Sequence, residues 1–221
     1  MADLPFVDFH CHFPSLNAVY CTSGPEVLTE STKAINQSFL YCQGLLPQNW
    51  TAQKQEELLT NLKNPNIQLG EVGLDKRFKD AISLEEQEHA LKTMLQFAKM
   101  NNKIVTIHSV QATERTINLL KVANLQPWKT IWHGFTGSNE TAKVLFTMGV
   151  FVSIGLRYTG KLEELASIHP RFVLETDYEG ADQTQYNALL ESHYNNCAKQ
   201  LGWALEDLKE HCYGQTQTLK N

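Results

Sequence analysis

The feature that most constrains the fold of this chain is a repeated alternation between short apolar runs and longer helix-like stretches. The short runs are rich in β-branched and aromatic residues, as expected for strands covered on both faces. Because strands that alternate with helices pair in parallel, the pattern predicts an α/β fold, a TIM-like (β/α)8 barrel. The eight runs are residues 4–9, 18–22, 38–43, 67–72, 103–107, 130–132, 150–154 and 171–175.

The helix-like stretches begin with recognisable start signals. Ser83 and Glu86 have the spacing of a capping box, and Ser138 precedes another amphipathic stretch. Pro25 stands where a first helical turn accepts proline. Residues 183–208 are predicted to form one or two closing helices.

The connection between the first two strands is unusually short. Only residues 10–17 separate them, whereas a parallel crossover normally takes a dozen or more residues. The sequence therefore predicts that the first crossover helix is missing. Such a gap leaves apolar barrel wall that another segment, or a second copy in a homodimer, is expected to cover.

Length and composition predict one soluble domain over residues 1–221. The chain has neither a signal-peptide pattern nor an apolar run long enough for a membrane span. Its five cysteines are scattered without CxxC spacing, which favours the reducing cytoplasm. The net charge of -5 argues against a large surface for duplex DNA, but bound divalent ions would change the local charge.

Six candidate functional residues share one property, which is that each lies at the end of a predicted strand. In a parallel barrel all strands end at one rim, so residues far apart in the sequence meet there. His10 and His12 point to the same side because they are two residues apart in an extended chain. The set is His10, His12, Glu71, His108, His133 and Asp177.

These residue types suit a hydrolase with two metal ions. Imidazoles bind zinc, manganese or iron, and a carboxylate such as Glu71 can bridge two ions. Such ions activate a water as the nucleophile, and Asp177 is the carboxylate best placed to orient it and accept its proton. We therefore expect Glu71 and Asp177 to act in catalysis as well as in metal binding.

Five short motifs, in this order, resemble those of the TatD family of metal-dependent hydrolases in the amidohydrolase superfamily. They are HCH, GEVGLD, IVTIHS, HGFTGS and ETD, and the resemblance runs from residue 5 to about residue 180. It implies a TIM-like barrel, two divalent ions and deoxyribonuclease or related phosphodiesterase activity on DNA ends or short oligonucleotides. Carried over by motif, one ion is held by His10, His12, Glu71 and Asp177, and the other by Glu71, His108 and His133.

The chain departs from the family pattern beside these ligands. Val110 replaces a usual arginine, residues 178–180 replace small residues and a proline, and Leu46 replaces a histidine. These departures affect substrate contacts and leave the predicted ligands in place. Candidate substrate contacts near the rim are Arg77, Arg157 and Tyr158, and Asp75 is a candidate for orienting a ligand histidine.

Several alternatives remain open from the sequence. The same metals could serve hydrolysis of an amide, lactone or ester, or the barrel could be a degenerate, non-catalytic binding module. The ligand types accept zinc, manganese, magnesium or nickel. The remaining histidines are predicted to lie on the surface, namely His89, His169, His193 and His211.

Overall fold

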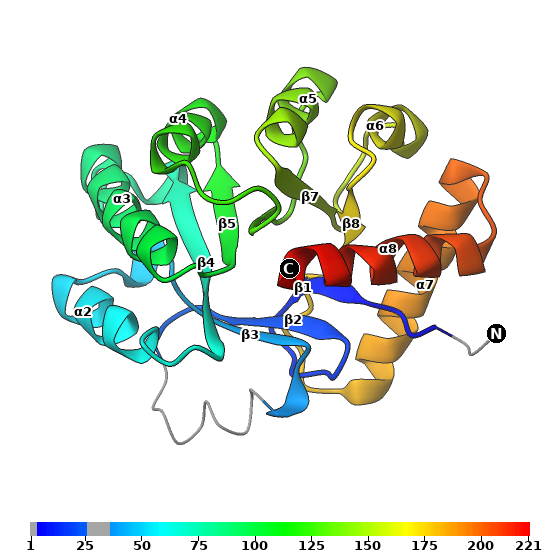
Figure 1. Cartoon of the computed structure of the whole chain (residues 1–221), viewed down its shortest axis with the longest axis horizontal. Helices are drawn as coiled ribbons and strands as arrows, with labels where there is room; N and C mark the ends of the chain where they lie inside the picture. The colour runs from blue at the N-terminus through cyan, green and yellow to red at the C-terminus, as the bar shows by residue number, and fades with distance from the viewer. Residues whose placement is uncertain (1–3, 26–35) are drawn as a thin grey trace.

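Eight parallel strands form a nearly closed barrel in a computed structural model that describes residues 4–25 and 36–221 (Figure 1). Each strand pairs in parallel with the next along the chain, from β1 through β8. The predicted TIM-like architecture is therefore confirmed. The strands are β1 (Asp8–Cys11), β2 (Ala18–Thr22), β3 (Leu40–Leu45), β4 (Ile67–Asp75), β5 (Val105–Val110), β6 (Thr130–Trp132), β7 (Val150–Ile154) and β8 (Val173–Leu174).

The barrel closes between β1 and β8 through hydrogen bonds at their C-terminal ends. The Asp177 N–H donates to the His10 carbonyl over 3.0 Å, and the His12 N–H donates to the Tyr178 carbonyl over 2.8 Å. The buried Asp8 carboxylate also accepts hydrogen bonds from the N–H and hydroxyl of Thr176, at 3.0 and 2.5 Å. These bonds bring two histidines and Asp177 to the same point of the rim.

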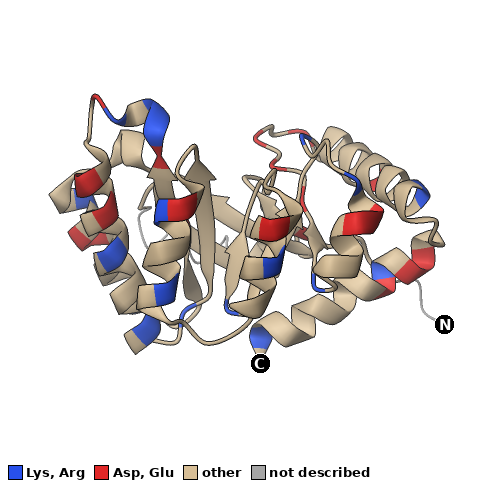
Figure 2. Ribbon diagram, turned by 90° about the horizontal axis from the view of Figure 1, so that it is seen from above, with Lys and Arg blue, Asp and Glu red and all other residues tan. Residues whose placement is uncertain are grey.

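Helices surround the barrel, and many of the Lys, Arg, Asp and Glu residues lie on them (Figure 2). The predicted capping box of Ser83 and Glu86 is confirmed, as is the Ser138 cap. The helix expected after Pro25 lies outside the described residues. The elements are η1 (Pro47–Asn49), α2 (Ala52–Asn61), η2 (Lys76–Phe78), α3 (Leu84–Met100), α4 (Thr113–Ala123), α5 (Asn139–Thr147), α6 (Leu162–Ile168), α7 (Gln183–Leu201) and α8 (Leu205–Lys220).

The last helix, α8, crosses the end of the barrel where the strands begin (Figure 1). Lys129, just before β6, donates to the carbonyls of Leu219 and Lys220 at the end of this helix. The Lys220 ammonium in turn lies 4.1 Å from the centre of the Phe39 ring, beside β3. The prediction that the closing helices end near residue 208 was wrong, because α8 continues to Lys220 and covers this end. No helix in the described part of the chain is long and apolar enough to cross a membrane.

The missing first crossover helix is confirmed. Residues 12–17, all of which the structure describes, connect β1 to β2 through bends and a turn without a helix. Four of the five residues of β2 are buried, and the fifth, Tyr20, packs its ring 5.5 Å from that of Tyr41. The homodimer that would cover the remaining wall stays a prediction.

Several predicted strand boundaries were wrong. β1 begins at Asp8 rather than at residue 4, and β4 and β5 continue to Asp75 and Val110. Backbone pairing does not depend on whether a side chain is apolar, so these strands continue past the apolar runs. Consequently His10 and His108 lie inside strands rather than after them, and Glu71 lies in the middle of β4.

Candidate metal centre

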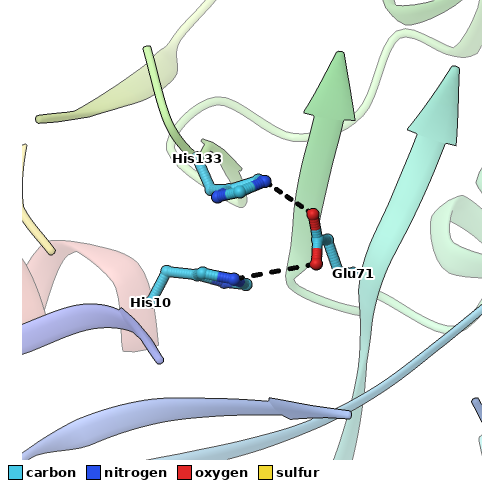
Figure 3. A group of neighbouring side chains, drawn as sticks. All are labelled: His10, Glu71 and His133. Carbon is cyan, nitrogen blue, oxygen red and sulfur yellow. Dashed lines mark ion pairs between the residues drawn. The ribbon is translucent and has the colours of Figure 1, made fainter. Parts of the chain in front are cut away.

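Glu71 lies at the centre of the candidate site because β4 bulges there. Between Leu69 and Val72, β4 has one residue more than either neighbouring strand, since the register shifts against both β3 and β5. A bulge of this kind turns a side chain away from the regular alternation of the sheet. The Glu71 side chain is 4% exposed and points toward His10 and His133 (Figure 3).

Each carboxylate oxygen of Glu71 faces a different pair of histidines. Its Oε1 lies 2.6 Å from both His108 Nδ1 and His133 Nε2. Its Oε2 lies 3.8 Å from both His10 Nε2 and His12 Nε2. The carboxylate therefore stands between two groups of imidazoles that come from opposite parts of the barrel.

Asp177 completes the group that contains His10 and His12. Its Oδ1 lies 3.4 Å from His10 Nε2 and 3.7 Å from His12 Nε2, while its Oδ2 accepts a hydrogen bond from Arg157 over 2.5 Å. The backbone of Asp177 is left-handed, with φ of 54°, so the chain turns sharply after β8. The structure thus brings together all six predicted residues: His10, His12, Glu71, His108, His133 and Asp177.

The electrostatics of the cluster favour an ionised carboxylate at its centre. Burial alone would raise the pKa of Glu71, but the charge of His133 and hydrogen bonds with His108 and His133 hold this pKa well below its usual range. Burial would lower the pKa of His133, yet Glu71 and Glu175 raise it well above the ordinary value. The pKa of Asp177 is likewise lowered, because His10 outweighs the opposing effect of burial.

The unsatisfied atoms of the cluster fit a bound cation. Both ring nitrogens of His10 are buried without a hydrogen-bond partner among the described residues. Ligand atoms of His10, Glu71 and His133 lie within 4.8 Å of one another, and so do those of His10, His12 and Asp177. Nitrogen and carboxylate donors converging in this way suit a divalent transition-metal ion.

Neighbouring groups hold two of these imidazoles in place. His12 Nδ1 lies 2.9 Å from the carbonyl of Cys21, which leaves its Nε2 directed at the cluster. His108 Nε2 lies 3.1 Å from Oδ2 of Asp75, the residue expected to orient a histidine. Arg77 holds Asp75 in turn through bonds from Nε and from its terminal nitrogen, the latter 2.5 Å long.

Two cavities flank the cluster. One, of about 390 Å³, is lined by Arg157, Tyr158, Glu175 and Asp177 among others. The other, of about 410 Å³, is lined by both Arg77 and Arg157 together with His108 and His133. All three residues predicted as substrate contacts therefore line space next to the cluster.

Sequence reasoning missed two buried carboxylates, Asp8 and Glu175. Asp8 joins β1 to Thr176, and its burial raises its pKa to about 7 despite the hydrogen bonds it accepts from Thr176. Asp8 precedes His10 by two residues, and Glu175 precedes Asp177 by two. In an extended chain such residues point to the same side, so the rule that pairs His10 with His12 could have identified both carboxylates.

The prediction that the other histidines lie on the surface was partly wrong. His89 is exposed, but His169 and His193 are buried, and each lies 2.8 Å from a backbone carbonyl, of Val150 and Ile154 respectively. His211 is half-buried and lies 2.8 Å from the carbonyl of Phe172. These histidines fill space between the helices and the barrel. Their positions in the sequence do not show whether their side chains face the barrel or the solvent.

A parallel eight-stranded barrel with histidines and carboxylates gathered at its C-terminal rim is the arrangement of the TIM-barrel metal-dependent hydrolases. Residues 16–220 match the family model described as TatD related DNase, and the chain belongs to that family. The resemblance noted in the sequence motifs is therefore confirmed.

Individual relatives agree with this assignment. An uncharacterized metal-dependent hydrolase of Buchnera aphidicola is 26% identical over 214 residues, which cover 77% of this chain and 80% of that protein. Human Deoxyribonuclease TATDN3 is 32% identical over 148 residues, but the match covers 61% of this chain and only 53% of the relative. The crystal structure of YJJV, a TatD homologue from Escherichia coli K12, superposes with a TM-score of 0.79 at 22% identity, covering 97% of both chains, and supports the fold.

Proposed function

We propose that this protein hydrolyses phosphodiester bonds with two divalent metal ions. The observation that carries the proposal is the position of Glu71, whose two oxygens each face a separate pair of imidazoles. A carboxylate placed in this way can bridge two ions roughly 3.5–4 Å apart. The proposed ligands are His10, His12, Glu71 and Asp177 for one ion, and Glu71, His108 and His133 for the other.

Bound ions at this site would lower the pKa of an attacking water and stabilise negative charge on the phosphate. Asp177 is the proposed proton acceptor for that water. Its side chain is 20% exposed, so one side faces the cavity, and its lowered pKa keeps it ionised near neutral pH. Arg157 holds Oδ2 of this carboxylate, which fixes the direction of the remaining lone pairs.

The flanking arginines favour an anionic substrate. Arg77 and Arg157 line the same cavity beside the cluster, and their side chains are 56% and 78% exposed. Guanidinium groups bind phosphate oxygens through paired hydrogen bonds. Because human TATDN3 is named a deoxyribonuclease, we propose DNA ends or short oligonucleotides as the substrate.

We further propose that residues 1–221 act as one catalytic domain in the cytoplasm. The five cysteines are all buried and unpaired, which suits a reducing compartment.

A substrate panel tests the proposed bond. The purified protein is assayed on a model phosphodiester, a short single-stranded oligonucleotide, an ester and a lactone, before and after chelation and after adding back Mn²⁺ or Zn²⁺. We expect turnover of the two phosphodiesters, its loss on chelation and its return with the ion. Turnover of only the ester or the lactone would show that the site hydrolyses carboxylic ester bonds rather than phosphodiesters. A metal-loaded protein that is inactive on all four substrates would indicate a binding module.

The Arg157→Met variant tests the proposed contact with phosphate. Loss of one charge-assisted hydrogen bond, worth about 1.5 kcal/mol or more, is expected to lower kcat/KM for the oligonucleotide at least about 10-fold. Lys161→Met is the matched control, because Lys161 is an exposed cation that pairs with Glu164 on α6. Equal kcat/KM in the two variants would show that Arg157 contributes neither to binding nor to orienting Asp177.

A further inference from the structure

Glu175 is a buried carboxylate without a role in the function proposed above. It follows β8 directly, and its backbone N–H donates to the Ile154 carbonyl of β7 over 3.1 Å. Its side chain is 1% exposed. Burying a carboxylate is costly unless neighbouring groups compensate its charge.

The Glu175 side chain reaches across the end of β7 to the segment that follows β6. Its Oε1 accepts a hydrogen bond from the Gly134 N–H over 2.6 Å and lies 3.5 Å from Nδ1 of His133. One oxygen therefore binds the backbone of Gly134 and lies beside the ring of the residue before it. Gly134 continues the chain in a left-handed conformation with φ of 57°. β6 itself is only three residues long and ends before His133.

Gly155, which follows β7, leaves the space through which this side chain passes. A Cβ atom at Gly155 would lie 3.1 Å from Oε1 and 3.4 Å from Cγ of Glu175. Because the distance to Oε1 is tighter than an ordinary contact, a side chain at position 155 would push the carboxylate oxygen away from its place. The absence of a side chain at residue 155 thus permits the link between β8 and His133.

The opposite nitrogen of the same ring faces the candidate metal centre. His133 Nε2 lies 2.6 Å from Glu71 Oε1, whereas Nδ1 faces Glu175. A carboxylate beside Nδ1 keeps the proton of a neutral imidazole on that nitrogen and leaves the lone pair of Nε2 available to a metal ion. His108 has the same arrangement, with Asp75 beside the nitrogen that faces away from Glu71.

We propose that Glu175 is the positioning residue of His133, fixing the ring and its tautomer so that Nε2 is presented to the second ion. The inference rests on the proposed two-metal function. Metal affinity should therefore depend on a hydrogen-bond acceptor at position 175 that is long enough to reach across β7. A negative charge or a side chain of the same volume should not be sufficient.

Three variants separate these properties. Glu175→Leu keeps most of the volume, Glu175→Asp keeps the charge but loses reach, and Glu175→Gln keeps the reach and an acceptor oxygen without the charge. We expect the dissociation constant for Zn²⁺, measured by competition with a chelating dye, to rise about 10- to 100-fold in the first two variants. Glu175→Gln is expected to recover most of the affinity.

Glu179→Gln and Glu179→Leu are the matched controls. Glu179 is an exposed carboxylate that lines the same cavity of about 390 Å³ as Glu175. Both are expected to bind Zn²⁺ as the wild type does. The ¹⁵N shifts of the His133 ring in the Zn²⁺-loaded protein give a second measurement, with the proton on Nδ1 in the wild type and in Glu175→Gln. Thermal unfolding of each metal-free variant identifies any that does not fold. If either Glu175→Leu or Glu175→Asp does not fold, the other still tests the positioning role.

Equal Zn²⁺ affinity in the wild type, Glu175→Leu and Glu175→Asp would overturn the positioning role while leaving the proposed function intact. Higher affinity in Glu175→Asp than in Glu175→Gln would also overturn it, because charge rather than reach would then be decisive. A wild-type protein that binds no divalent ion would instead overturn the two-metal proposal itself, and this inference with it.

Discussion

Replacing Glu71 with Gln is expected to abolish binding of both divalent ions and to lower phosphodiester turnover by more than about 100-fold, since changing residues that merely support a ligand already costs about 10–100-fold. The amide lacks the charge of the carboxylate and has one acceptor oxygen in place of two. Its NH2 group would necessarily face one of the two histidine pairs. Metal content after dialysis and turnover of the model phosphodiester are measured on the same samples.

Glu163→Gln is the control for this experiment. It makes the same change of charge and shape at an exposed position on α6. Metal content and turnover of the control should equal those of the wild type. If Glu71→Gln retained two bound ions and wild-type turnover, the bridging role of Glu71 would be untenable.

Replacing Gly73 with Ala is expected to destabilise the fold by about 3 kcal/mol, the upper end of the usual cost of overpacking, because the added atom overlaps backbone rather than a movable side chain. The new Cβ would lie 2.6 Å from the carbonyl carbon of His108, and closer still to its oxygen. Gly73 and His108 are register partners, so the overlap forces β4 and β5 apart between two proposed ligands. The free energy of unfolding in urea, measured with chelator present, reports this loss without a contribution from metal.

Gly214→Ala is the matched substitution. Gly214 lies within α8, and an added Cβ would have no described atom within 4 Å apart from its chain neighbours and the nearby backbone of its own helix. Alanine is favoured over glycine inside a helix, so this variant is expected to gain about 0.5–1 kcal/mol. A Gly73→Ala protein as stable as the wild type would show that β4 and β5 are less closely paired than described.

The sequence was sufficient to predict the fold and the meeting of the six candidate ligands. Both predictions depend on a single physical rule, that parallel strands alternating with helices end at one rim. The rule needs only approximate strand positions, which is why errors of several residues at β1 and β5 did not disturb it. His10 and His108 reach the cluster from inside their strands as well as they would from just beyond them.

The supporting contacts could not be predicted in the same way. The link from Glu175 to His133 crosses β7 and depends on the space left by Gly155, so it follows from packing between three strands. The pairing of Arg157 with Asp177 depends on how two loops fold over the rim. Strand patterns place such residues at the rim but do not say which of them touch.

Anomalous diffraction from crystals grown with Mn²⁺ or Zn²⁺ would locate the ions in the barrel. We expect two peaks, one contacted by His10, His12 and Asp177 and the other by His108 and His133, with an oxygen of Glu71 touching each. A single peak without Glu71 as a ligand, or metal bound only elsewhere on the protein, would contradict this expectation.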